Sequence, residues 1–357
     1  MLKNYFKIAL RNLWRDKAFN FINILGLSLG MICVILILFY IMDELSYDKH
    51  FKDSDRIHRI AIDIENSNKT KLTTAPVTGM LPQALAEYPQ IEEVTRLIGN
   101  FARKTLVSVN ADKQFYEDQF YWVDPNLFKV FNYKFLRGNP ATALESPLNM
   151  VITREMAEKY FGTIDALGKT LKTPGKAYQI TGVVENLPSN SHFKLDFMAS
   201  MLGFPNPDAE KNWHATMFHT YVKLKPNSDA KQFEAQIHDV AYKYVREEIK
   251  NNGQKYRFFL QPLTSIHLHS HLEFELGKNN SYRQLQVLGV VAIIILLIAC
   301  FNFINIATAR ATRRAKEVGI RKTLGSGRWQ LVGQFFMESL LMSTFSLLIA
   351  LVGCRAY

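Results

Sequence analysis

Apolar residues along the chain are gathered into three long runs rather than spread evenly. The first run, residues 18–42, and the second, residues 284–309, contain 25 and 26 residues and no charged side chain. The third, residues 329–352, contains a single acid, Glu338. At roughly 1.5 Å per residue, a helix of this length exceeds the roughly 30 Å hydrocarbon core of a bilayer. The pattern therefore predicts three transmembrane helices, and the first is too long and lacks the cleavage site of a signal peptide.

Between the first two runs the pattern is that of an α+β domain, residues 43–283. The segment "DRIHRIAIDIE" alternates like a strand, "VTGMLPQALAEYP" is typical of a helix, and "EEVTRLIG" of a second strand. Much later, "HTYVKLKP", "DAKQFEAQIHDVAYKYVREEI" and "YRFFLQPL" repeat this β-α-β order. We expect the two units, residues 44–104 and 212–283, to pack into one split subdomain. Residues 105–211 would form a second, inserted subdomain with two hairpins, one turning at residues 110–113 and one at Pro174-Gly175.

The net charge of +11 lies almost entirely beside the predicted membrane helices. Residues 1–17 carry five basic side chains and one acid, and residues 310–328 carry seven and one, whereas residues 43–283 are nearly neutral. Two crossings place both basic segments on one face, which the positive-inside rule identifies as cytoplasmic. The charge therefore indicates topology and contact with anionic membrane lipids rather than nucleic-acid binding.

The expected fold class is thus three α-helical transmembrane segments plus a large α+β extracytoplasmic domain of two subdomains. The expected location is the cell inner membrane, multi-pass, with a cytoplasmic N-terminus and a periplasmic domain. Residues 1–17 are predicted to form an amphipathic helix on the inner leaflet. Its apolar face would comprise Leu2, Phe6, Ala9, Leu10, Leu13 and Trp14.

No motif in the sequence indicates catalysis or a cofactor, so the chain is not expected to be an enzyme. The stretch "FGTIDALGKT" ends like an ATP-binding phosphate loop, but the position for the first glycine holds Thr163, and Gly162 is one place out of register. A helical stretch precedes it and a strand-like stretch follows, the reverse of the motif's order. We expect a helix-ending glycine and a turn here.

The stretch "SIHLHSH" would place His267, His269 and His271 on one face of a strand, at a spacing that could bind zinc or copper. Glu273 and Glu275 continue the alternation, but no clear ligand pattern accompanies the histidines. A surface strand near the membrane is the alternative, and we assign no metal. All three cysteines lie in the apolar runs, which leaves no disulfide framework in the polar domain.

Five positions within the apolar runs are candidates for packing or polar contacts. Gly26 and Gly30 form a Gly-x-x-x-Gly patch that permits close approach of another helix. Asn302 and Asn305 lie near the inner end of the second run, where interhelical hydrogen bonds or interfacial water would satisfy them. Glu338 lies about nine residues, or roughly 13 Å, into the third run. A carboxylate at that depth is costly, so we expect a partner, with an Arg or Lys of the basic loop the nearest candidate.

The segment 310–339, "RATRRAKEVGIRKTLGSGRWQLVGQFFMES", connects the second run to the third through an amphipathic turn and a Gly-Ser-Gly break. An ordinary basic loop does not require apolar side chains exposed to the cytoplasm. The segment has three, which could dock into a groove on a cytoplasmic partner: Val318, Ile320 and Leu324. At "KEVGIRKTLGSGRWQL" and "QFFMES" the chain resembles the FtsX-like permeases, the MacB type of ABC transporter membrane subunit. Further stretches, among them "VDPNLFKVFNYKFLRGNPATAL" and "ITGVVENLPSNSHFKLDF", resemble the MacB-like periplasmic core domain.

This resemblance implies a permease subunit whose periplasmic domain moves when a separate ATPase binds and hydrolyses ATP. The implied partners are a cytoplasmic ABC ATPase, a second copy or second permease half, and a periplasmic or outer-membrane protein. The implied coupling helix, which would touch the ATPase, comprises Glu317, Val318, Gly319, Ile320, Arg321, Lys322, Leu324 and Gly325.

The sequence departs from the family pattern at its end, because the family has at least four crossings and only three are predicted here. A truncated or non-functional permease is one alternative that this departure leaves open. Another is a membrane-anchored binding or sensory protein, whose loop at 310–328 would dock a signalling partner instead of an ATPase.

Overall fold

The protein is described by a computed structural model that divides into two compact units, each with its own packing. A helical unit comprises Met1–Leu45 and Tyr282–Tyr357, and an α/β unit comprises Ser46–Ser281. The structure describes residues 6, 10, 11, 14, 17–99, 104–238, 240, 242–244, 254–313, 315–323, 325 and 327–355. Most of the predicted amphipathic helix at 1–17 lies outside these residues. Phe6, Leu10 and Trp14, which belong to its predicted apolar face, are helical and exposed.

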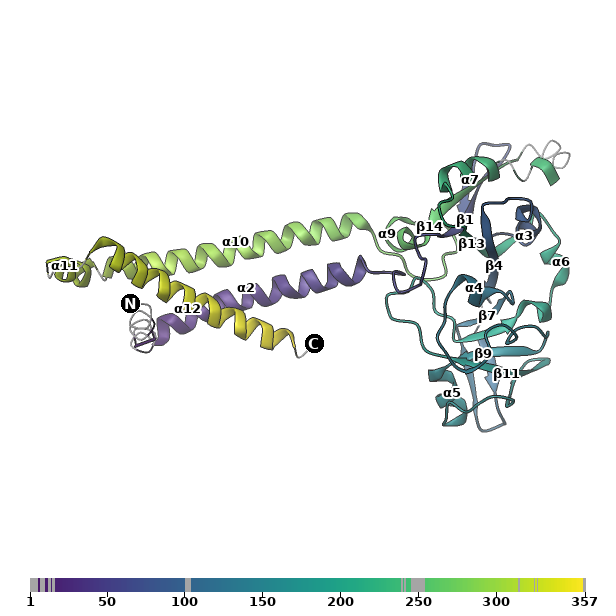
Figure 1. Ribbon diagram of the computed structural model, residues 1–357, viewed down its shortest axis with the longest axis horizontal. Helices are drawn as coiled ribbons and strands as arrows, with labels where there is room; N and C mark the ends of the chain where they lie inside the picture. Colours follow the sequence, from purple (N-terminus) through teal and green to yellow (C-terminus); the bar gives the residue numbers. More distant parts are fainter. Residues whose placement is uncertain are drawn as a thin grey trace. The chain divides into compact units, whose positions relative to one another are not determined.

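Three long helices confirm the three predicted transmembrane segments. They are α2 (Lys17–Glu44), α10 (Tyr282–Arg313) and α12 (Arg328–Cys354), and each is long and apolar enough to cross a membrane. A short helix, α11 (Ala315–Thr323), connects α10 to α12. Helix α2 contacts both of the other long helices, and Figure 1 shows α2 and α10 side by side with α12 crossing α2.

Side-chain contacts fix the relative direction of the three helices. Gly30 and Gly26 of α2 lie against Ala299 and Asn302 of α10, in reverse order along the chain, so these helices are antiparallel. Ser346 Oγ of α12 donates a hydrogen bond of 3.3 Å to the carbonyl oxygen of Ile24. Further along both helices, Gly353 lies against Ile32, so α12 is parallel to α2. The arrangement is that of a chain that crosses a layer three times in alternating directions.

The α/β unit is built on one sheet of 14 strands, whose main path runs in the order β14-β1-β13-β4-β7-β12-β9-β11-β10-β5-β6. The strands are β1 (Ile57–Glu65), β2 (Lys71–Thr74), β3 (Val77–Thr78), β4 (Ile91–Gly99), β5 (Thr105–Ser108), β6 (Gln114–Glu117), β7 (Phe120–Val123), β8 (Phe135–Gly138), β9 (Asn149–Thr153), β10 (Thr170–Thr173), β11 (Lys176–Val184), β12 (Phe197–Ser200), β13 (Thr216–Leu224) and β14 (Lys255–Pro262). The helices are α3 (Leu81–Leu85), α4 (Leu127–Val130), α5 (Arg154–Phe161), α6 (Pro207–Glu210), α7 (Ala230–Ile237) and α9 (Ile266–His269). Both predicted hairpins are present, as β5–β6 and β10–β11.

The predicted helix at 77–89 is wrong at its start. Val77 pairs with Phe218 as part of strand β3, and α3 begins only at Leu81. Pro82 stands in the first turn of α3, where its missing N–H is not needed and its fixed φ suits the helix. The loop that resembles a phosphate loop follows the expected order of helix, turn and strand. Helix α5 ends at Phe161 and is capped by Gly162, whose φ is +69° and whose N–H donates to the Glu158 carbonyl at 2.8 Å.

Apolar residues of the α/β unit form separate clusters beneath different helices. One contains Ile60, Val222 and Phe258 of the sheet with Leu81 of α3 and Phe233 of α7. Another packs α5 against β9, β11 and β12 and draws only on residues between 107 and 199. A third combines residues from 51 to 266. The predicted division into two subdomains stays a prediction, since the sheet runs through both parts.

Two buried polar groups connect distant parts of the α/β chain. Arg59 of β1 is fully buried and donates to Glu275, Gln261 and Ser270. His192 lies 2.9 Å from Asp48 through Nδ1 and 2.7 Å from the Tyr221 hydroxyl through Nε2. Asp48, which follows α2 closely in the sequence, is completely buried.

Asp196 gives the α/β unit a specific dependence on pH. Burial, followed by the charges of Glu155 and Glu117, raises its pKa from 3.8 to about 6. Between about pH 4 and pH 6 the folded chain therefore keeps a proton on Asp196 that the unfolded chain has lost. The stabilisation that comes from this protonated carboxyl is complete below about pH 4 and is lost as the pH rises through about 6. We expect Asp196→Asn to raise the free energy of unfolding at pH 7 by about 1–2 kcal/mol and to leave it unchanged at pH 4.

The measurement is urea unfolding of residues 46–281 at pH 4, 5, 6 and 7. Asp112→Asn, at the exposed tip of the β5–β6 hairpin, is the matched control for removing one carboxylate. Equal stability differences for both variants at every pH would contradict the role given to Asp196.

Candidate functional site

The segment between α10 and α12 contains the short helix α11, and two glycines, Gly325 and Gly327, separate this helix from α12. Thr323 Oγ1 at the end of α11 donates to the Ile320 carbonyl at 2.8 Å, and the Gly325 N–H donates to the Lys322 carbonyl at 3.1 Å. Gly325 has φ +89°, a conformation that side chains with a Cβ rarely adopt. At Gly327 the backbone N–H donates to the Gln330 side chain at 3.3 Å, which marks the start of α12. The sequence therefore folds as a compact helical connection.

Helix α11 carries most of the residues predicted for the coupling helix. Ile320 is 53% exposed, an unusual position for a β-branched apolar side chain, and Lys322 beside it is exposed too. Gly319 is exposed, and a Cβ built there would meet nothing within 4 Å. Val318 is half-buried. Glu317 and Arg321 belong to α11, but their side chains, like Leu324 as a whole, lie outside what the structure describes.

The two glycines of the Gly-x-x-x-Gly patch lie at the contact between α2 and α10. A Cβ built on Gly30 would lie 2.6 Å from the Cβ of Ala299, closer than two such atoms can approach. A Cβ on Gly26 would lie 3.0 Å from Nδ2 of Asn302. Both positions support the proposal that these glycines let the helices approach closely.

The predicted intramembrane polar residues lie in different surroundings. Asn302 and Asn305 are both exposed on α10, although Asn302 also reaches the backbone of α2 beside Gly26. Glu338 is only 4% exposed and lies on the face of α12 that packs against α2. The described residues around it include Asn20 and Asn23. Its pairing with a basic residue of the loop stays a prediction.

The sequence interpretation missed the polar companions of Glu338. Asn20 and Asn23 of α2 and Gln334 of α12 are all less than 9% exposed. The signal was present in the spacing, since Asn20 and Asn23 are three residues apart and Gln334 and Glu338 four apart, which places each pair on one helix face. The packing of α2 against α12, which brings the two pairs together, has no counterpart in the sequence pattern.

The predicted strand with three histidines on one face is wrong. Residues 263–265 form a 3₁₀ turn and residues 266–269 form α9, so the histidines do not alternate along a strand. His267 is buried with its ring stacked on Tyr47 at 3.4 Å between centroids, whereas His269 is exposed. Glu275, which was expected to continue the alternation, binds Arg59 instead. Among the described residues no group of three or more His, Cys, Asp or Glu side chains could hold a metal ion.

Comparisons with known families agree with this architecture. Residues 20–240 match the family of the MacB-like periplasmic core domain, and residues 289–354 match the FtsX-like permease C-terminal family. The chain belongs to the MacB/FtsX-type ABC transporter permeases. The core-domain match covers most of α2 and most of the α/β unit, and the FtsX-like match covers most of α10, all of α11 and α12.

Curated relatives of this permease share about a quarter of its sequence. The macrolide export ATP-binding/permease protein MacB of Neisseria meningitidis serogroup A is 25% identical over 219 residues, 58% of this chain and 30% of the relative. The uncharacterized ABC transporter permease YvrN of Bacillus subtilis is 24% identical over 234 residues, 63% of this chain and 54% of the relative. The permease thus spans less than a third of the MacB relative and about half of YvrN.

A solved structure supports the fold of the α/β unit. The crystal structure of a domain assigned to a permease protein of Porphyromonas gingivalis matches 59% of this chain and 91% of that domain. The TM-score is 0.52 at 22% sequence identity, which shows a shared fold.

Proposed function

We propose that this permease couples ATP hydrolysis by a partner ATPase to movement of its α/β unit. The observation that carries the proposal is α11, a short basic helix between two membrane helices that exposes Ile320 and Gly319. An exposed apolar side chain in a segment rich in basic residues is suited to a groove on a protein partner. Membership of the permease family supplies the kind of partner, a cytoplasmic ABC ATPase.

The proposed orientation places α11 and the chain's N-terminus in the cytoplasm and the α/β unit in the periplasm. It is supported by the basic residues at 1–17 and 310–328, which the positive-inside rule assigns to the cytoplasmic face. The α/β unit would then transmit the work of the ATPase to a periplasmic substrate or partner. A second copy, or a second permease half, would complete the assembly.

Charging or enlarging the exposed face of α11 tests the proposed coupling. We expect Ile320→Asp to weaken copurification of the ATPase roughly tenfold or more, because a carboxylate would have to be buried in an apolar contact. Leu324→Asp and Gly319→Trp should likewise reduce permease-dependent ATP hydrolysis. Gly319→Trp should not unfold the chain, since there is open space around that position.

Leu202→Asp is the matched control for these variants. Leu202 is 58% exposed on a 3₁₀ turn of the α/β unit, so the substitution adds the same charge at a similarly exposed site away from α11. Full ATPase copurification and ATP hydrolysis in Ile320→Asp and Gly319→Trp, with correct membrane insertion, would refute the coupling role of α11.

A further inference from the structure

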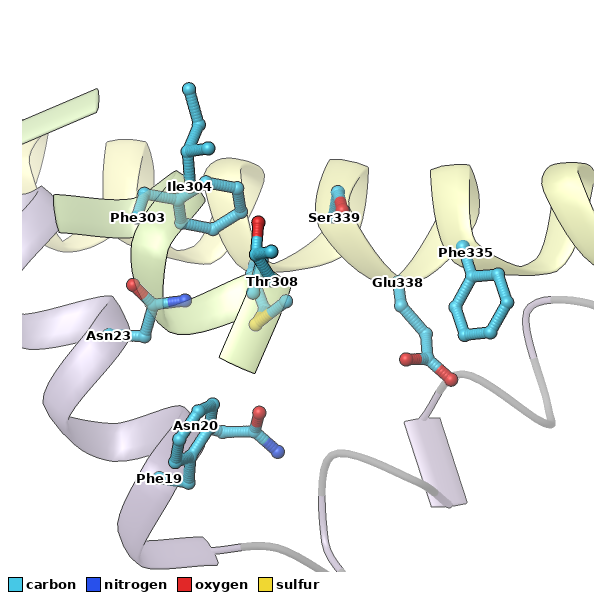
Figure 2. Close-up of a pocket in the computed structure, with 11 residues that line it drawn as sticks. Phe19, Asn20, Asn23, Phe303, Ile304, Thr308, Phe335, Glu338 and Ser339 are labelled. Carbon is cyan, nitrogen blue, oxygen red and sulfur yellow. The ribbon is translucent and has the colours of Figure 1, made fainter. Parts of the chain in front are cut away.

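Both units of the chain contain a cavity, and the described lining of each cavity belongs to one unit alone. The cavity of the helical unit lies where α2, α10 and α12 meet, and Figure 2 shows Asn20 and Asn23 of α2 and Glu338 of α12 around it. These side chains belong to the packing of the helices described above. The cavity of the α/β unit measures about 250 Å³ and is lined by residues of β5, β7, β10 and β11 and by Pro205. This second cavity combines aromatic walls with cationic side chains.

Curvature of the sheet creates the cavity of the α/β unit. In the order of the strands, β7 and β5 are separated by β12, β9, β11 and β10, yet Trp122 of β7 and Leu106 of β5 line the same cavity. The sheet therefore curls until these two strands face each other, and Val107 of β5 joins the apolar cluster beneath α5. Among the described residues the ladder between β5 and β10 consists of one pair, Lys172 and Ser108. The curled sheet is thus nearly open at this seam, as at the mouth of a barrel, where small ligands commonly bind.

One side of this cavity is an aromatic wall that packing holds in place. Trp122 Nε1 donates a hydrogen bond of 3.2 Å to the Tyr178 hydroxyl, and the Trp122 ring meets the Phe120 ring edge-on at 5.1 Å between centroids. Phe120 and Tyr178 are each 1% exposed. Pro174 and Pro205 continue the apolar lining. The wall is therefore preformed for a flat apolar group, which lowers the entropy cost of binding one.

The polar part of the lining consists of hydrogen-bond donors and positive charge. Lys104 and Lys176 line the cavity, and its described lining contains no Asp or Glu. Lys176 donates one N–H to the Gly203 carbonyl, which positions the ammonium and leaves its other two N–H groups for a ligand. The Tyr178 hydroxyl is already an acceptor, and none of the described residues accepts its own proton. Lys104 pairs with Asp118 at 3.2 Å, but both side chains are 60% exposed, so water screens this pair. A hydrogen-bond-accepting anion is the complement of this lining.

We propose that this cavity binds an apolar carboxylate, in which one carboxylate group is attached to a flat apolar group. The carboxylate accepts from the Lys176 ammonium and the Tyr178 hydroxyl, and the apolar group lies on the wall that contains Trp122. The volume is below the range of about 300–1,000 Å³ typical of sites for drug-sized ligands, which suits a single ring system or one terminal residue of a peptide. The proposal concerns the α/β unit alone and does not depend on coupling to an ATPase, so either can fail without the other.

Isothermal titration calorimetry of the full chain in detergent micelles at pH 7 tests the proposal, with a titration into micelles alone subtracted for each probe. The probes share one indole ring and differ in charge: indoleacetate is anionic, indoleacetamide is neutral and tryptamine is cationic. We expect indoleacetate to bind roughly tenfold or more tightly than the other two, because only a carboxylate forms charge-assisted hydrogen bonds with an ammonium. Equal affinities for the three probes, or no binding of indoleacetate, would overturn the proposal without the use of any variant.

A peptide probe distinguishes the two sources of such a carboxylate. The tripeptide acetyl-Gly-Pro-Trp is titrated as the free acid and as the amide under the same conditions. Binding of the peptide acid roughly tenfold more tightly than its amide would support the end of a peptide as the ligand. Binding of indoleacetate without binding of the peptide acid would support a free carboxylic acid.

Two variants locate the bound anion. Lys176→Gln is expected to lower the affinity for indoleacetate roughly tenfold and to leave that for indoleacetamide unchanged, and Tyr178→Phe to lower the affinity for indoleacetate several-fold. Lys172→Gln is the matched control for charge, because Lys172 is exposed on β10 and is absent from the described lining. Tyr116→Phe is the control for the hydroxyl, since Tyr116 is 67% exposed on β6. A preference for indoleacetate over indoleacetamide that survives both Lys176→Gln and Tyr178→Phe, or that Lys172→Gln lowers as much as Lys176→Gln, would overturn the proposal.

Discussion

Replacing Arg59 with alanine is expected to lower the free energy of unfolding of the α/β unit by about 3–5 kcal/mol. The Arg59 side chain is completely buried, with Nη2 at 3.0 Å from Glu275 Oε1 and 2.9 Å from Ser270 Oγ, and Nε at 3.1 Å from Gln261. Burial alone would raise the pKa of Glu275, but the hydrogen bonds and charge of Arg59 outweigh this and hold it below its usual value. Without Arg59 the carboxylate would be buried with no counter-charge.

Two further variants test whether the lost stability comes from breaking the buried pair of Arg59 and Glu275 or from removing an arginine in general. Arg137 Nε lies 2.6 Å from Asp165 Oδ1, but both side chains are largely exposed, so Arg137→Ala should cost less than about 1 kcal/mol. The double variant Arg59→Met/Glu275→Leu, which removes both charges and keeps the volume, should recover most of the lost stability. The measurement is urea unfolding of residues 46–281. A cost for Arg59→Ala no greater than that for Arg137→Ala would show that the buried pair does not stabilise the unit.

The sequence predicted the membrane helices well because the bilayer leaves few alternatives. Backbone groups in a hydrocarbon layer must pair within the segment, so runs of 25 and 26 residues without charge can only be helices or closed barrels. The two hairpins were predicted for a similar reason, since Pro174-Gly175 and Asn110 fix the backbone locally. Gly175 has φ +82°, and the Asn110 side chain accepts from the N–H groups of Asp112 and Lys113.

The buried pair of Arg59 and Glu275 could not be predicted in the same way. The alternation of "DRIHRIAIDIE" places Arg59 with Ile57 and Ala61 on one face of the strand, but it does not tell what covers that face. In the structure Ile57–Ile62 of β1 are buried on both sides, and the partner of Arg59 lies 216 positions further along the chain. A long-range partner of this kind depends on tertiary packing, which periodicity does not encode.

The histidine segment shows the opposite failure, in which a local pattern suggested the wrong element. A stretch as short as "SIHLHSH" does not distinguish a single helical turn from a strand, because apolar and polar positions alternate in too few residues to show a period. In the helical turn that forms instead, His267 stacks on Tyr47 and Ile266 packs into the apolar cluster that combines residues from 51 to 266. In the helical unit the sequence predicted where Glu338 lies along its helix, whereas its neighbours on α2 were unknown until the two helices were placed together.

The close contact of α2 with α10 leads to a second prediction of large effect. We expect Gly30→Ile to destabilise the helical unit by about 1–3 kcal/mol or more, since even the first added carbon would lie 2.6 Å from the Cβ of Ala299. The helices would have to separate, and in a bilayer close packing is the main force that holds them together. The measurement is the midpoint of unfolding of the full chain as sodium dodecyl sulfate is added to mixed micelles.

Gly289→Ile is the matched control, because nothing lies within 4 Å of a Cβ at that position of α10. Both substitutions make the same change in helix propensity and apolar surface, so a difference between them isolates the packing. The reciprocal variant Gly30→Ala/Ala299→Gly moves one methyl group across the contact and should recover stability that Gly30→Ala alone loses. Equal unfolding midpoints for Gly30→Ile and Gly289→Ile would show that α2 and α10 do not pack through Gly30. If the reciprocal variant regains the stability that Gly30→Ala loses, Gly30 and Ala299 must be direct neighbours in the folded membrane protein.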